Sequence, residues 1–195
     1  YFRNMDEDHG EFKLDLSVPF SQWSGKSSTF KFGGMVAQKQ RDFSERLFTF
    51  KQNPTYNYNG NPNDLFSEDN VGLLDSSGVI NQFGLYTVEI YQPSSNYTGD
   101  RTISAGYAMV DMPLMERLRF IGGVRYETTD MEVASQDTTK EKGILNTDDL
   151  LPSVNLIYEL TGNTNLRLAY GRTLARPSFR EMAPYASFDF WGGFI

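Results

Sequence analysis

The stretch LLPSVNLIYELTGNTNLRLAYGRTLARPSF, residues 150–179, contains two long runs in which apolar and polar side chains alternate. The turn TGNTN, residues 161–165, separates the two runs. Alternation with period two predicts an antiparallel hairpin with one apolar face. Each arm is longer than the ~5–6 residues of a typical soluble strand and matches the ~9–11 residues that a strand needs to cross a bilayer. The apolar face carries Leu150, Pro152, Val154, Leu156, Tyr158, Leu160, Leu166, Leu168 and Tyr170.

Similar alternation recurs along the chain and predicts an all-β, antiparallel sheet. The predicted strands are about 11–20, 28–48, 101–114, 117–133, 150–160 and 165–176. Short connections, SQWSGKS, MERL and TGNTN, alternate with long polar ones at about 51–100, 134–149 and 177–195. One end of the sheet is therefore expected to carry tight turns, and the other end long loops, which we expect to be extracellular.

Long strands with one apolar face indicate a transmembrane β-barrel. Inside hydrocarbon every backbone N–H and C=O group must be paired within the protein, so a lipid-exposed sheet cannot have open edges. Six strands cannot close around a wide lumen with charged walls, and we therefore expect this chain to be a segment of a larger barrel. The prolines at segment ends and the aromatic residues near them agree with a strand that meets water at both ends. These aromatic residues are Phe12, Phe20, Phe43, Tyr126, Tyr158 and Tyr170.

Composition excludes several other classes of protein. The formal net charge of −7 argues against nucleic-acid binding, which depends on Lys and Arg side chains that neutralise phosphates. The chain has no cysteine, which excludes a disulfide scaffold, a Cys-ligated zinc site and a thiol nucleophile. It begins at Tyr1 without a signal peptide, and we interpret it as an internal segment of a longer protein.

No pattern in the sequence predicts catalysis, a metal site or a cofactor. His9 is the only histidine and has no nucleophile motif near it, so a solvated histidine near a loop end is the favoured interpretation. The glycine pairs at 33–34 and 122–123 lie inside predicted strands, where they would let the backbone bend or let another group pack closely. The remaining candidates are acidic residues without the spacing of a calcium loop, which we expect to be solvated: Asp6, Glu7, Asp8, Asp148 and Asp149.

Two groups of side chains are candidates for contact with a solute. The polar faces of the strands carry charges expected to point into the lumen, where they would contact a plug or solute, or simply line a hydrated interior. They are Lys31, Lys39, Arg41, Arg119, Arg125, Glu127, Glu159 and Arg167. In the long loop 51–100, Tyr56, Tyr58 and Phe66 offer aromatic faces that suit a carbohydrate or an aromatic siderophore, although variable surface also collects in such loops.

The amino-acid sequence of several segments resembles that of the barrels of TonB-dependent outer-membrane receptors. The resemblance is carried by LLPSVNLIYEL, TGNTN and LRLAYGRTLARPSFREMAPY, by YAMVDMPLMERLRFIGGVRYE, and by FKLDLSVPF with FKFGGMVAQKQRDF, and covers most of residues 11–190 in the family's order. It implies a 22-stranded barrel in the outer membrane of a Gram-negative bacterium, closed by an N-terminal plug that is not found in this sequence. It also implies TonB-energised import of a ferric siderophore, haem, cobalamin or oligosaccharide, with outer-membrane lipid, the TonB complex and the cargo as partners; a surface lipoprotein is left open as a further partner.

Two alternatives to transport remain. One is a passive porin or surface adhesin built on a similar barrel, which would lack a plug and a TonB-contacting segment upstream. The other is a soluble β-sheet protein that binds carbohydrate, which would be recovered without detergent.

Overall fold

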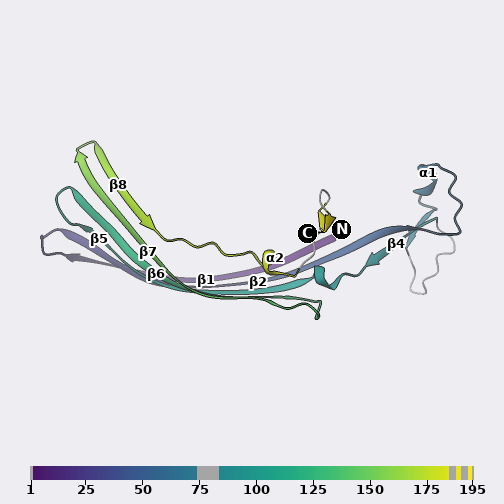
Figure 1. Ribbon diagram of the computed structural model, residues 1–195, viewed down its shortest axis with the longest axis horizontal. Helices are drawn as coiled ribbons and strands as arrows, with labels where there is room; N and C mark the ends of the chain where they lie inside the picture. Colours follow the sequence, from purple (N-terminus) through teal and green to yellow (C-terminus); the bar gives the residue numbers. More distant parts are fainter. Residues whose placement is uncertain (1, 74–83, 185–187, 190–192, 195) are drawn as a thin grey trace.

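The computed structural model describes residues 2–73, 84–184, 188–189 and 193–194, and most of them belong to one curved antiparallel sheet (Figure 1). The elements are β1 (Phe2–Ser21), β2 (Ser27–Gln52), α1 (Pro62–Leu65), β3 (Val71–Leu73), β4 (Leu85–Ile90), a 3₁₀ turn η1 (Pro93–Ser95), β5 (Tyr97–Pro113), β6 (Leu118–Ser135), β7 (Gly143–Thr161), β8 (Thr164–Gly171), α2 (Phe179–Met182), β9 (Phe188–Asp189) and β10 (Gly193–Phe194). None of the helices in the described residues is long and apolar enough to cross a membrane.

The main sheet has the order β1-β2-β5-β6-β7-β8, with every neighbouring pair antiparallel. The far end of β2 also pairs with β4, which pairs in parallel with β3. Among the described residues, β1 and β8 each have one hydrogen-bonded neighbour, so the sheet is open at both edges. The predicted all-β antiparallel fold is confirmed as an open barrel wall.

The register places the predicted apolar residues on one face. Across the middle of the sheet, Leu16 lies opposite Phe32, and Val124 lies opposite both Ala108 and Pro152. Many of these side chains are exposed in this chain, including Phe12 at 72% and Leu168 at 68%. The few buried apolar residues lie elsewhere, so this sheet has no conventional core beneath its apolar face.

Several strands extend further than the sequence predicted. The first begins at Phe2 rather than residue 11, and the fifth begins at Gly143 rather than residue 150, which shortens the loop before it to residues 136–142. The predicted strand 101–114 begins at Tyr97, and the predicted strand 28–48 continues to Gln52. In these extensions apolar residues such as Met5, Phe50 and Ile144 do not recur at every second position, so apolar alternation could not reveal the strands, although the ladder of backbone hydrogen bonds continues.

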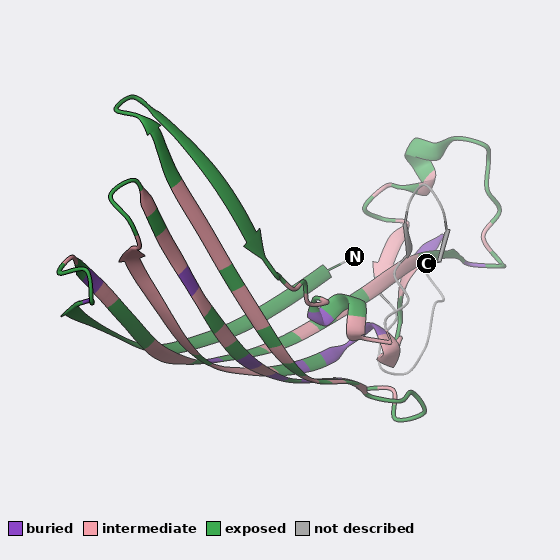
Figure 2. Cartoon of the chain, turned by 60° about the vertical axis from the view of Figure 1, so that its left-hand side comes forward, coloured by how far each residue is buried: buried purple, intermediate pink, exposed green. Residues whose placement is uncertain are grey.

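Two segments differ from the sequence prediction in kind. The predicted loop 51–100 contains α1, β3 and β4, while residues 74–83 within it lie outside the described part of the chain. The predicted strand 165–176 ends at Gly171, and the next residues leave the sheet. They run along the concave side of the sheet towards α2 (Figures 1 and 2). We call residues 172–184 the strap.

Candidate functional site

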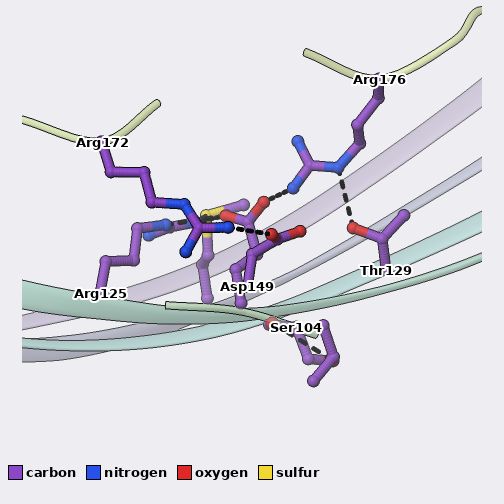
Figure 3. Close-up of polar contacts among 9 residues, drawn as sticks. Ser104, Arg125, Thr129, Asp149, Arg172 and Arg176 are labelled. Atoms are coloured by element: carbon purple, nitrogen blue, oxygen red, sulfur yellow. Dashed lines mark hydrogen bonds and ion pairs between the residues drawn. The ribbon is translucent and has the colours of Figure 1, made fainter. Parts of the chain in front are cut away.

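The concave face of the sheet carries the charged residues singled out from the sequence. Strand alternation and register place all eight of them on the face opposite the apolar one. Arg125, for example, lies opposite Tyr107 and Leu151, one residue out of phase with the apolar row at Val124. The strap contacts this same face, which identifies it as the concave one (Figure 3).

One group of ion pairs joins β1 to β2. The Glu7 carboxylate accepts from the Lys39 ammonium at 2.6 Å and from the Arg41 Nε at 2.7 Å. These side chains are partly covered, with about a fifth to a quarter of each exposed. The prediction of a loop carboxylate at position 7 is wrong, since Glu7 lies in β1 and pairs with two of the predicted lumen charges.

A second group centres on Glu127 of β6, which is 6% exposed. Arg125 donates to Glu127 Oε2 from Nε at 2.8 Å and from Nη2 at 2.5 Å. The other carboxylate oxygen, Oε1, pairs with the Arg176 guanidinium of the strap. Two arginines thus share one buried carboxylate, and each keeps an oxygen of its own.

The strap makes two further polar contacts with the wall (Figure 3). Arg176 donates from Nε to the buried Thr129 hydroxyl at 2.8 Å, and Arg172 lies 3.6 Å from an Asp149 carboxylate oxygen. Asp149, predicted as a solvated loop residue, instead lies in β7 and faces the strap. The strap is therefore tied to β6 and β7 by side chains.

Phe179 at the start of α2 inserts into a socket on the wall. Its ring is 3% exposed and packs with Tyr97, Met131 and Val133 in a buried cluster. The guanidiniums of Arg41 and Arg101 lie 5.3 Å and 5.8 Å from the ring centroid, within the range of a cation–π contact. Together these residues form what we call the Phe179 socket.

Glycine 99 makes the socket deep enough for the ring. A Cβ atom at Gly99 would lie 2.6 Å from Cδ1 of Phe179, closer than real Cβ contacts allow. The α2 turn that presents the ring is fixed by a capping box between Ser178 and Glu181. The hydrogen bond from the Ser178 N–H lowers the pKa of the Glu181 carboxyl.

A third cluster shows what one of the predicted glycine pairs does. The Tyr107 hydroxyl of β5 donates to Asp15 of β1 at 2.7 Å, across the intervening strand β2. Gly33 lies directly beneath this bridge, because a Cβ there would meet the Leu14 carbonyl oxygen at 2.3 Å and the Tyr107 ring at 2.9 Å. The prediction that a glycine here allows close packing agrees with this geometry.

The remaining sequence candidates lie apart from these clusters. Arg119 pairs with Asp111 at 2.6 Å near the tight turns, while Lys31, Glu159 and Arg167 take part in none of the ion pairs described above. Tyr56, Tyr58 and Phe66 lie in the excursion around α1, beyond the end of the main sheet. The Tyr56 hydroxyl accepts from Asn70 Nδ2 at 2.9 Å, whereas Tyr58 and Phe66 are 41% and 61% exposed. The structure therefore does not bring the loop candidates to the concave face.

Acidic residues and the single histidine do not converge on a metal site. Asp6, Glu7 and Asp8 belong to one strand and alternate between its faces, and His9 is a strand residue rather than a loop residue, with Nε2 3.8 Å from Glu11. Among the described residues, no group of three or more Asp, Glu or His side chains could hold a metal ion. The concave face instead carries paired basic and acidic side chains that can make polar contacts.

The sequence prediction missed Arg101, Arg172, Arg176 and Phe179. Small residues around 101–114 obscured the alternation that would have assigned Arg101 to the polar face. The other three lie beyond the sheet, where strand periodicity gives no information. The only signal in the sequence is the run RPSFRE, in which a proline precedes a serine with a glutamate three residues later, as in a helix start.

An open antiparallel wall with one apolar and one charged face defines a segment of a membrane β-barrel. The sequence matches the model of the family described as TonB dependent receptor-like, beta-barrel, over residues 3–193. The chain belongs to this family. No curated protein matches.

Among solved structures, the chain resembles the alcaligin outer membrane receptor FauA from Bordetella pertussis. The two are 12% identical, with a TM-score of 0.57. The match covers 87% of this chain and 22% of that one, so the chain spans about a fifth of the length of the structure it matches. At this identity the likeness shows the fold. The family and the matched structure are receptors rather than enzymes.

Proposed function

We propose that this chain forms part of the barrel wall of a TonB-dependent transporter in the outer membrane of a Gram-negative bacterium. The observation that carries the proposal is the separation of the two faces of the sheet. The convex face exposes large apolar side chains on five strands of the main sheet, β1, β2, β6, β7 and β8, and the concave face holds the ion pairs of Glu7 and Glu127. A contiguous apolar surface of this kind needs a non-aqueous neighbour.

The limits of the apolar belt support a bilayer as that neighbour. On β1 the unbroken apolar row of the convex face ends at Phe12, and the same face then carries Asp8 and Asp6. The same change occurs on the neighbouring strands, where carboxylates follow the apolar rows on the convex face at Asp42, Asp100, Asp130, Glu132 and Asp148. Because a carboxylate in hydrocarbon is costly, this acidic row marks the boundary with water.

The position of the belt supports an orientation in the membrane. The belt lies next to the tight turns at Gln22–Lys26 and Gly162, whereas the strands continue well beyond it on the other side. In the proposed orientation the tight turns face the periplasm, and the long strand ends, with the excursion around α1, face the outside. The concave face then lines the lumen.

Family membership supports a proposal on cargo and energy coupling for the whole protein. The proposed activity is TonB-energised import of a scarce nutrient: a ferric siderophore, haem, cobalamin or an oligosaccharide. The proposed partners are outer-membrane lipid, the TonB complex and the cargo, with a surface lipoprotein as a further option. The matched structure is a receptor for alcaligin, and a siderophore is one of the proposed cargoes.

Cell fractionation and growth test the proposal in two stages. The full-length protein should be recovered with outer membranes and should require detergent for release; recovery in the soluble fraction would favour the carbohydrate-binding alternative. A deletion strain should then lose growth on one limiting iron or glycan source, and loss of TonB should give the same defect. Uptake that is unaffected by loss of TonB would favour the passive porin or adhesin.

A further inference from the structure

The strap crosses the concave wall without joining the sheet. Among the described residues, its one backbone hydrogen bond to a strand runs from the Arg172 N–H to the Pro152 carbonyl at 3.0 Å. The other backbone bonds of the strap lie within it, around α2. A strand of the same length would be fixed by a ladder of such bonds, so the strap depends on a few side-chain contacts.

The ion pair to the wall can be broken without leaving a buried carboxylate alone. Glu127 keeps two hydrogen bonds from Arg125 when Arg176 departs. Arg176, in contrast, lies where Arg101 and Arg125 repel it electrostatically. Since an uncompensated buried charge is what makes breaking such pairs costly, sharing of Glu127 lowers the cost of release.

The Phe179 socket supplies the other attachment. The Phe179 ring fills a space that exists because residue 99 has no side chain. The guanidiniums of Arg41 and Arg101 lie over the faces of this ring. Removal of the ring would leave two guanidiniums and the apolar cluster of Tyr97, Met131 and Val133 facing the concave side. The socket is covered in this structure, and departure of the ring would uncover it.

We propose that residues 172–184 are a reversible strap, which docks on the wall through Arg176 and Phe179 and on release exposes Arg41, Arg101 and Glu127 to the lumen. A segment that is held by one backbone hydrogen bond and a few side-chain contacts opens locally at lower free energy than the hydrogen-bonded strands it covers. The strap thus provides a conformational switch in the wall. The inference rests on the proposed function only in identifying the concave face with the lumen.

Distances between two spin labels test the strap directly in the full-length receptor in lipid membranes. This chain has no cysteine, so labels can be placed at Ala175→Cys on the strap and Gly162→Cys on the β7–β8 turn after any cysteine elsewhere in the protein is replaced. Both positions are exposed, and a Cβ at Gly162 meets nothing within 4 Å. The docked strap should give one narrow distance distribution.

Substitutions on the wall and on the strap should each release it. Gly99→Ala places a methyl group against the Phe179 ring and should broaden and shift the distribution, whereas Gly106→Ala on the same strand should not, because its nearest contact is 3.9 Å away. Arg176→Gln should also broaden it, while Arg167→Gln removes the same charge from the concave face of β8 without touching the strap. Folding of each variant is checked by heat-modifiable electrophoretic mobility.

A broad distribution of spin-label distances in the receptor that carries only the two labels would contradict the proposal that the strap docks on the wall. Identical distributions for the parent, Gly99→Ala and Arg176→Gln would overturn release. If Gly99→Ala does not fold, Arg176→Gln still decides, because Arg176 lies outside the sheet. None of these readouts depends on transport, so a failed uptake assay with a normal distance shift would count against the proposed function and not against the strap.

Discussion

Arg176 of the strap pairs with Glu127 of β6, a carboxylate that is 6% exposed and already holds Arg125. Glu127→Gln removes the negative charge with which both guanidiniums pair. Breaking a buried ion pair costs about 3–5 kcal/mol, and the partial exposure of the arginines, 30% and 20%, reduces this to about 2 kcal/mol. The free energy of unfolding in lipid vesicles, measured by denaturant titration, should fall by that amount.

The matched control for this substitution is Glu159→Gln on β7. Glu159 carries the same charge on the same face but is exposed beside the tight turn. Its substitution should change the unfolding free energy by less than about 0.5 kcal/mol. An equal decrease in the free energy of unfolding for both variants would mean that Glu127 stabilises the protein through its negative charge alone and not through its specific pairing with the two arginines.

Gly33→Ala should destabilise the wall where Tyr107 bridges to Asp15. The new methyl group would meet the Leu14 carbonyl oxygen at 2.3 Å, and this backbone atom cannot move as a flexible side chain could. Overpacking of this kind costs about 1–3 kcal/mol. Gly10→Ala on β1, where a Cβ meets nothing within 4 Å, serves as the control in the same denaturant titration. Equal stability of the two variants would contradict the close packing at Gly33.

Val154→Arg and Ser153→Arg test the two faces of β7 with neighbouring residues. Val154 lies in the middle of the apolar belt opposite Gly122 and Tyr170, and an arginine there should cost about 2–4 kcal/mol. Ser153 lies on the concave face between Gly123 and Gly171, where an arginine should reach the aqueous lumen of the proposed barrel. Unfolding titrations in vesicles should therefore separate the two variants, and a larger loss for Ser153→Arg would reverse the assignment of the faces.

The capping box of α2 predicts a pH dependence of the strap. Because the hydrogen bond from Ser178 lowers the pKa of Glu181 in the folded protein, its contribution is present above the ordinary glutamic acid value of about 4.3 and is lost as the pH falls through the lowered pKa. Spin-label distances between the strap and the β7–β8 turn should therefore broaden in acid.

Glu181→Gln isolates the contribution of the capping box from the other contacts that hold the strap. Glutamine can complete the same capping box but does not titrate. The part of the acid broadening that belongs to Glu181 should disappear in this variant. An unchanged pH profile would show that the capping box does not contribute to docking.

The two-faced sheet could be predicted from the sequence because burial in lipid imposes alternation on every residue of the belt. Phe12 to Phe20 and Leu150 to Tyr158 show this pattern directly. The strand ends beyond the belt could not be predicted. There Asp8 faces water and its neighbour Glu7 forms an ion pair on the other face, and because both environments accept an acidic residue, no apolar alternation results.

The site was predictable only where it lies on strands. Arg125 and Glu127 could be assigned to the polar face by counting from Val124, but their mutual pairing depends on side-chain rotamers. The strap is held by tertiary contacts between residues about fifty positions apart in the chain, such as Arg176 and Thr129. No local sequence pattern predicts such contacts. The predicted exit from the sheet near Pro177 missed that the chain turns back over the wall.

Single-cysteine scanning of residues 150–158 tests the barrel-wall account most directly. The full-length protein, in lipid vesicles and free of other cysteines, carries a polarity-sensitive fluorophore at each position in turn. Labels at even positions should be quenched by brominated acyl chains, and unlabelled cysteines at odd positions should react with a water-soluble thiol reagent. Equal behaviour of even and odd positions, or quenching at the odd ones, would contradict a wall with lipid on one face and an aqueous lumen on the other.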